Sequence, residues 1–325
     1  MEYRKLGKTD LELSVITFGS WAAGGWLWGN TDRKEAIDAI RKGFDVGMTS
    51  IDTAPVYGQG DSEEIVGEAI KGVARDKVQI LTKFGMRWDL TKGTKFIQSY
   101  NNQQQAIDIY KYAGKESVIK ECEDSLRRMN TDYIDLYQIH WHDVTTPISE
   151  TFEAVEKLIQ QGKVRYVGVC NYKTEWMAEA EETIPILSNQ IPYSMITRKM
   201  EEETIPYCIE NNKPILAYSP LERGLLTGKL SINPQFASGD HRANHPSFTN
   251  ENIIKTNAML ARLQPLADDK GITLSQLVLR WTVQRPGITI ALAGARNAAQ
   301  SLQNAIAGEF SFSDEEMEFI DLIVG

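Results

Sequence analysis

Two patterns of apolar residues alternate along the chain. Short runs rich in β-branched residues, such as residues 14–19 (SVITFG) and 133–140 (YIDLYQIH), are followed by longer amphipathic stretches. In residues 33–47, for example, Ala36, Ile37 and Ile40 recur at helical spacing. Nearly continuous apolar runs are typical of parallel strands covered on both faces, and the longer stretches are typical of surface helices.

Eight strand–helix units can be read in this way. The expected strands are residues 14–19, 48–52, 77–83, 133–140, 164–170, 185–191, 213–219 and 287–294. The expected helices are residues 33–47, 62–73, 117–129, 149–163, 173–183 and 199–212, a helical region near 253–284, and residues 297–307. This order predicts the α/β class and a closed (β/α)₈ TIM barrel, with a doubly wound Rossmann sheet as the alternative.

Three further segments complete the expected architecture. Residues 2–14 (EYRKLGKTDLELS) predict an N-terminal β-hairpin that caps the bottom of the barrel. The polar residues 85–116 and 221–246 follow predicted strands, and we expect both to be long loops on the C-terminal face. Because no linker or repeat divides the sequence, we expect a single domain over residues 1–325.

Composition excludes several classes of protein. The chain of 325 residues is 42% hydrophobic, has no run of 18 apolar residues, and begins without the apolar core of a signal peptide. Its net charge of −9 argues against a general nucleic-acid partner. Cys122, Cys170 and Cys208 are too widely spaced for a disulfide framework or a zinc module. We therefore expect a cytoplasmic protein without a membrane or nucleic-acid partner.

Polar residues end three consecutive predicted strands. They are Asp52, Lys83 and His140, and Tyr57 lies in the loop just beyond Asp52. A buried lysine needs an anionic partner, and an ammonium beside a phenol lowers the phenol pKa. With a neutral histidine to orient the substrate, this set suits the protonation of a carbonyl oxygen as it becomes an alkoxide. Taken singly, each residue is equally explained by capping, packing or solvation.

A metal site is a competing interpretation of the same region. His140 and His142 share one face of a strand, with Asp143 beside them, as at the start of a barrel hydrolase site. His241 and His245 lie in a polar segment, and no HExxH or cysteine pair completes a ligand set. We therefore expect no metal.

Nucleotide-binding motifs are informative by their absence. The sequence has neither a GxGxxG fingerprint nor a Walker lysine, so a dinucleotide would have to bind at the rim of the barrel. Residues 292–304 (LAGARNAAQSLQN) are the candidate, because they pass from a strand end into a helix start and include Arg296. A tight turn alone would explain the small residues equally well.

Several segments together resemble the aldo-keto reductases. They are residues 52–70 (DTAPVYGQGDSEEIVGEAI), 82–85 (TKFG), 131–143 (TDYIDLYQIHWHD), 162–172 (GKVRYVGVCNY), 218–229 (YSPLERGLLTGK) and 293–304 (AGARNAAQSLQN). The resemblance runs from about Leu6 to the final helix and is nearest to the bacterial general stress and inositol-operon members. It implies a TIM-barrel oxidoreductase that reduces aldehydes and ketones to alcohols with NADPH, which leaves as NADP⁺.

The resemblance also implies roles for individual residues. Tyr57 would be the general acid, Lys83 and Asp52 would tune it, and His140 would orient the carbonyl. Cofactor contacts are implied for Ser20, Trp21, Asp52, Cys170, Asn171, Gln190, Tyr218, Ser219, Pro220, Leu221, Arg223, Gly224, Lys229, Arg242, Gly294, Arg296, Gln300 and Asn304. Cys170 stands where the family commonly has serine.

The substrate pocket is expected to be lined by aromatic residues. The candidates are Trp21, Trp26, Trp28, Trp88, His140 and Trp141. Two other functions stay open at this point. One is a nicotinamide-binding regulatory module with little turnover, which the more distant likeness to potassium-channel β subunits allows, and the other is the metal-dependent hydrolase.

Overall fold

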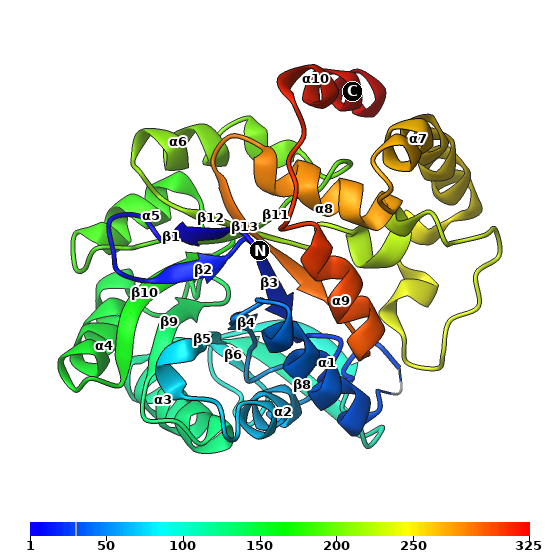
Figure 1. The fold of residues 1–325 in the computed structure, drawn as a ribbon. Coiled ribbons are helices and arrows are strands. Elements are labelled where there is room, and N and C mark those ends of the chain that lie inside the picture. The colour runs from blue at the N-terminus through cyan, green and yellow to red at the C-terminus, as the bar shows by residue number, and fades with distance from the viewer. Residues whose placement is uncertain (30) are drawn as a thin grey trace.

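Eight parallel strands form a closed barrel in the computed structural model, which describes residues 1–29 and 31–325. In barrel order they are β3 (Ile16–Gly19), β4 (Ser50–Asp52), β5 (Gln79–Phe84), β9 (Ile134–Ile139), β10 (Val164–Cys170), β11 (Asn189–Pro192), β12 (Ile215–Tyr218) and β13 (Ile288–Gly294), which pairs with β3 again. The structure therefore confirms the (β/α)₈ barrel and excludes an open Rossmann sheet (Figure 1).

Helices surround the barrel on its outside (Figure 1). They are α1 (Arg33–Asp45), α2 (Asp61–Ala69), α3 (Lys115–Met129), α4 (Ile148–Gln160), α5 (Thr174–Glu181), α6 (Thr204–Glu210), α7 (Asn250–Asp269), α8 (Leu274–Gln284), α9 (Ala298–Ile306) and α10 (Asp314–Val324). Within residues 1–29 and 31–325, no helix is long and apolar enough to cross a membrane.

Strand alternation divides the core into an outer and an inner part. On β5, Ile80 and Phe84 belong to the large core between strands and helices, whereas Leu81 belongs to a separate inner cluster. Because successive side chains of a strand point to opposite faces, Lys83 points inward like Leu81, two residues closer to the carboxyl end. The barrel interior is thus apolar below and polar above.

The N-terminal hairpin closes the lower end of the barrel. It consists of β1 (Tyr3–Lys5) and β2 (Glu12–Ser14), which pair antiparallel. Leu6, Leu11 and Leu13 are almost completely buried and complete the inner leucine cluster. The predicted hairpin and its position are confirmed.

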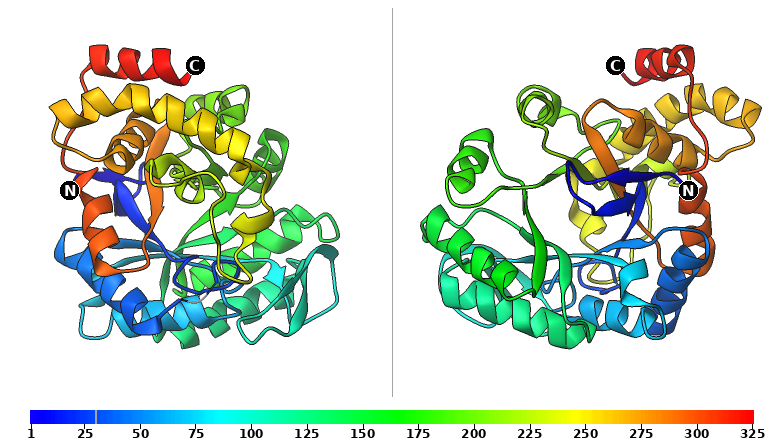
Figure 2. Two further views of the ribbon diagram at one scale, coloured as in Figure 1. Left: turned by 90° about the vertical axis from the view of Figure 1, so that its right-hand side faces the viewer. Right: turned by 60° about the vertical axis from the view of Figure 1, so that its left-hand side comes forward.

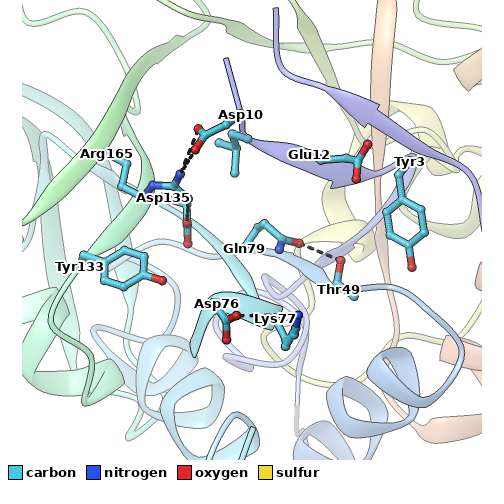
Figure 3. Close-up of a pocket in the computed structure, with 11 residues that line it drawn as sticks. Tyr3, Asp10, Glu12, Thr49, Asp76, Lys77, Gln79, Tyr133, Asp135 and Arg165 are labelled. Atoms are coloured by element: carbon cyan, nitrogen blue, oxygen red, sulfur yellow. Dashed lines mark hydrogen bonds and ion pairs between the residues drawn. The ribbon is translucent and has the colours of Figure 1, made fainter. Parts of the chain in front are cut away.

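Ion pairs hold this lower end together. Buried Asp135 accepts hydrogen bonds from Arg75 (2.7 Å), Arg165 (2.9 Å) and the Ile80 backbone N–H (2.9 Å). Arg165 also binds Asp10 of the hairpin, as Figure 3 shows beside a pocket of about 550 Å³. Polar clusters at the amino ends of barrel strands usually serve stability, and we assign that role to this one.

Residues 85–116 are not the loop that their polarity predicted. They form the three-stranded antiparallel sheet β6 (Met86–Arg87), β8 (Ala106–Lys111) and β7 (Thr94–Tyr100), before α3 begins at Lys115. We call residues 85–113 the insert sheet. Its two ends meet, because the Tyr112 N–H donates to the Gly85 carbonyl (3.1 Å). Figure 2 shows it at the end of the barrel opposite the N-terminal hairpin.

The second polar segment, residues 221–246, remains largely irregular. It contains the short 3₁₀ helices η3 (Glu222–Thr227) and η4 (His241–Asn244). Both short helices lie at the carboxyl end of the barrel strands: η3 directly follows β12, and His241 of η4 stacks on Trp21 in the loop after β3.

Removal of the charge on Asp135 should destabilise the protein. In Asp135→Asn, Arg75 and Arg165 lose a buried anionic partner, and we expect the free energy of unfolding to fall by about 2 kcal/mol, since both arginines stay partly solvated. Urea unfolding measures this change.

Asp10→Asn is the matched control. It removes a partner of the same Arg165, but the Asp10 side chain is 71% exposed, so the change should cost less than about 1 kcal/mol. Equal losses for the two variants would contradict the role given to Asp135.

Candidate active site

A fully buried ion pair lies at the upper end of the barrel. Lys83 Nζ donates to Asp52 Oδ1 (2.5 Å) and to the Thr53 carbonyl (2.9 Å), and both charged side chains are at most 4% exposed. Burial opposes the charge on Lys83, but the Asp52 carboxylate outweighs it and raises the lysine pKa. Lys83 therefore stays protonated inside the barrel.

Two glutamines hold the second oxygen of Asp52. Gln190 on β11 donates to Asp52 Oδ2 at 2.9 Å, and Gln138 on β9 approaches the same oxygen at 3.4 Å. Gln138 Oε1 in turn accepts from Gln190 (3.4 Å) and from the Cys170 thiol (3.9 Å). A Cβ at Gly168 would lie 2.6 Å from Ser188 Oγ and 3.3 Å from Gln138 Cγ, so this position favours glycine.

Tyr57 lies above the ion pair. Lys83 Nζ is 5.1 Å from the centre of the Tyr57 ring. Burial raises the pKa of Tyr57 to about 12, although the Lys83 charge acts in the opposite direction. Lys83 lowers the pKa of this phenol, as the sequence predicted, but the desolvation of the phenolate is the larger effect and Asp52 adds to it, so the net pKa is raised.

His140 contacts Tyr57 from the side. The two rings are 5.7 Å apart and nearly perpendicular. Burial, and then the Lys83 charge, lower the pKa of His140 well below its usual value. The imidazole is therefore neutral at physiological pH, as the sequence predicted, and can serve as a hydrogen-bond donor to an uncharged oxygen.

His140 and His142 lie in different surroundings. His142 stacks on Trp176 of α5 at 4.2 Å, whereas His140 faces Tyr57. Across residues 1–29 and 31–325, no group of three histidine, cysteine, aspartate or glutamate side chains is arranged to hold a metal ion.

The loop after β12 has an unusual backbone. Ser219, Glu222 and Arg223 have positive φ angles of 57°, 45° and 55°. Such backbone costs about 1 kcal/mol or more per residue and clusters at ligand sites, because it turns N–H groups toward a bound group. Just before it, the Tyr218 hydroxyl donates to Asn171 Oδ1 (2.9 Å).

Aromatic rings connect the loop after β3, here called the first loop of the barrel, with η4. Trp21 stacks on Tyr57 (6.1 Å between ring centres) and on His241 (5.1 Å). Trp28 meets the edges of Trp21 (5.3 Å) and His241 (5.0 Å). His241 was not among the predicted site residues, because its polar sequence context gave no sign of this packing.

Two arginines lie on the Trp28 ring. The guanidinium carbons of Arg242 and Arg296 are 5.0 and 5.4 Å from its centre. Arg242 is paired with Asp240 at 2.6 Å, whereas Arg296 makes no ion pair with any residue that the structure describes. Burial, followed by repulsion from Arg242, lowers the pKa of Arg296. An anion bound here would relieve both penalties.

Buried polar atoms that have no hydrogen-bond partner among the described residues gather in the same region. They include Trp21 Nε1, Trp28 Nε1 and Arg223 Nε. Buried donors are normally satisfied, so these atoms and Arg296 fit a ligand with several acceptor oxygens, such as the phosphates of a dinucleotide.

Several residues with a predicted cofactor contact already make hydrogen bonds within the protein. The Ser20 hydroxyl is bonded to Ser62 (2.7 Å), and Asn304 donates to the Gly294 carbonyl (3.0 Å). Gln300 Oε1 accepts from the Arg296 backbone (2.9 Å). Lys229 is exposed.

The insert sheet forms an apolar wall beside Tyr57. Trp26, Met86 and Ile109 are buried together with Ala54 and Val56, and this group, here called the wall cluster, is covered by Trp21, Leu27, Tyr57, Trp88, Ile107 and Trp141. Trp26 Nε1 donates to Ser99 of β7 (3.1 Å), and Asn102 at the hairpin tip donates to the Gly24 carbonyl (2.9 Å). The sheet is thereby fastened to the first loop.

Comparisons with known proteins agree on one family. The sequence pattern of the Aldo/keto reductase family matches residues 15–324. The chain is 38% identical to "Aldo-keto reductase YhdN" of Bacillus subtilis, covering 100% of this chain and 94% of that protein. It is 37% identical to the "NADH-specific methylglyoxal reductase" of Escherichia coli, over 96% of this chain and 94% of that protein.

Solved structures give the same result. A glycerol dehydrogenase of Gluconobacter oxydans superimposes with a TM-score of 0.86 at 35% identity, over 99% of this chain and 94% of that one. An aldo-keto reductase of Klebsiella pneumoniae in complex with NADPH gives 0.72 at 30% identity, over 99% and 95%. The resemblance noted in the sequence is confirmed.

Proposed function

The chain belongs to the aldo/keto reductase family of oxidoreductases, and from this premise we propose that it reduces an aldehyde or ketone to an alcohol with Tyr57 as proton donor. NADPH, when bound, supplies the hydride that reaches the carbonyl carbon. The observation that carries the proposal is the ionised Lys83–Asp52 pair buried directly beneath a partly accessible phenol.

The residues of this site divide the work. His140, being neutral, donates a hydrogen bond that orients the carbonyl oxygen toward Tyr57. Tyr57 gives its proton to that oxygen as negative charge develops on it. The nearby Lys83 ammonium stabilises the phenolate that remains, and Asp52 holds that ammonium in position.

We assign the cofactor to the region between the loop after β3, the loop after β12 and the start of α9. Tyr218 and Asn171 would hold the nicotinamide end, and the N–H groups around Arg223 would hold the phosphates. Gln190 donates its amide to Asp52, so it would serve the ion pair as well as the cofactor. Residues 1–325 would act together as one barrel domain.

Tyr57→Phe should lower the rate of carbonyl reduction by at least about a thousandfold, because the variant lacks the hydroxyl that gives its proton to the carbonyl oxygen. NADPH binding should persist, since the ring remains. The measurement is loss of nicotinamide absorbance with an aromatic aldehyde, together with a fluorescence titration of NADPH.

Tyr166→Phe serves as the control, because its hydroxyl binds Asp10 at the opposite end of the barrel. It should keep wild-type turnover. Full activity in Tyr57→Phe would end the proposed mechanism.

The rates of carbonyl reduction and of alcohol oxidation should depend differently on pH. Reduction needs the protonated phenol, and burial raises the Tyr57 pKa to about 12, so kcat/KM for reduction should stay level between roughly pH 6 and 10. Alcohol oxidation needs the phenolate and should rise over the same interval. Steady-state profiles in both directions measure this, and loss of reduction centred below about pH 8 would contradict a phenol donor in this environment.

Arg296 supports NADPH over NADH, because it is a half-buried cation that no carboxylate of the described residues pairs with. In Arg296→Leu we expect the KM for NADPH to rise about tenfold and that for NADH to change little. Arg127→Leu on α3, where 74% of the side chain is exposed, is the matched control. An unchanged KM for NADPH would show that Arg296 does not bind the 2′-phosphate, the group that distinguishes NADPH from NADH.

A further inference from the structure

Lys111 lies on the face of the insert sheet that looks toward the active site. In strand β8 it follows Ile107 and Ile109 at every second position and so shares their face, and both isoleucines pack in the wall cluster. It also stands opposite Met86 of the same cluster in the antiparallel pair β6–β8, and opposite residues of such a pair point to the same face. The lysine therefore continues the wall that ends at Tyr57.

The Lys111 ammonium rests on aromatic rings rather than on a carboxylate. Nζ is 5.6 Å from the centre of the Phe96 ring and 5.8 Å from that of Trp141, the residue next to His140. In the described part of the chain, no acidic side chain pairs with it.

The two neighbouring carboxylates, those of Asp108 and Asp143, already have other partners. Asp108 on the opposite face of β8 pairs with Lys95 (2.7 Å). The buried Asp143 accepts from the Ala113 N–H (2.9 Å) and from the hydroxyls of Thr145 and Thr146 (2.6 and 2.7 Å). Lys111 is thus a half-buried cation at the edge of an apolar wall without an internal anion.

We propose that Lys111 makes the enzyme selective for carbonyl compounds that carry a carboxylate on an apolar or aromatic body. This inference rests on the proposed reductase function. The carbonyl end lies at Tyr57 and His140, the body packs against Trp88 and Trp141, and the carboxylate receives a charge-assisted hydrogen bond from Lys111. Since the whole chain carries a net charge of −9, long-range attraction of anions does not produce this selectivity, and the contact with Lys111 does.

The test compares an aldehyde that carries a carboxylate with its uncharged methyl ester. The intrinsic carbonyl reactivities of 4-carboxybenzaldehyde and its methyl ester are the same for every variant, so a change in the ratio of their kcat/KM values between variants reports recognition of the carboxylate. We expect Lys111→Met to lower the acid-to-ester ratio about tenfold, and Lys111→Arg to keep it. Higher ionic strength should lower the ratio in the wild type and not in Lys111→Met.

Lys92→Met is the control, because Lys92 is an exposed lysine of the same sheet that lies over a different ring, that of Tyr112 (5.8 Å). Its acid-to-ester ratio should equal the wild-type value. An unchanged ratio in Lys111→Met, or a parallel loss for both aldehydes, would overturn the selectivity while leaving the reductase intact. Failure of the wild type to reduce either aldehyde would instead overturn the proposed function, and the selectivity with it.

Discussion

A lysine ammonium without any solvent contact is the constraint around which the upper barrel is built. An uncompensated buried charge would cost several kcal/mol, so every group around Lys83 has to offset that cost. Asp52 supplies the opposite charge, and Gln190 and Gln138 hold its second oxygen. The assembly is neutral as a whole, and it presents a positive end beneath the phenol of Tyr57.

The lower barrel gives this assembly a rigid base. Leucines of the hairpin fill the bottom, and Asp135 joins residues around β5, β9 and β10 through its hydrogen bonds. The charged residues of the site thus lie above the apolar inner cluster of leucines, which carries no charge. Such separation lets the site be preorganised without weakening the core below it.

Much of this arrangement is readable from alternation in the sequence. Asp52, Lys83 and His140 end apolar runs, and that position alone brings them together in the barrel. Gln138 lies two residues before His140 in the same predicted strand and therefore points to the same face. It could have been predicted as a neighbour of Asp52 by the same argument. The strands of the insert sheet were missed because polar residues dominate it, although the alternation of Ile107 and Ile109 indicated one. The high pKa of Tyr57 could not be read from sequence, because it depends on how completely packing excludes water.

The meeting of the two ends of the insert sheet, where Tyr112 binds Gly85, bears on how this enzyme acquires new specificities. A segment that leaves and returns at one point changes neither the register of the barrel strands nor the spacing between Lys83 and His140. Its other attachments are side-chain contacts. Ser99 accepts from Trp26, and Asn102 donates to the Gly24 carbonyl and to Asp61. Arg87 pairs with Glu121 of α3. Selection can therefore exchange the whole wall as a module, and a laboratory can graft one, while the proton-transfer machinery is inherited intact.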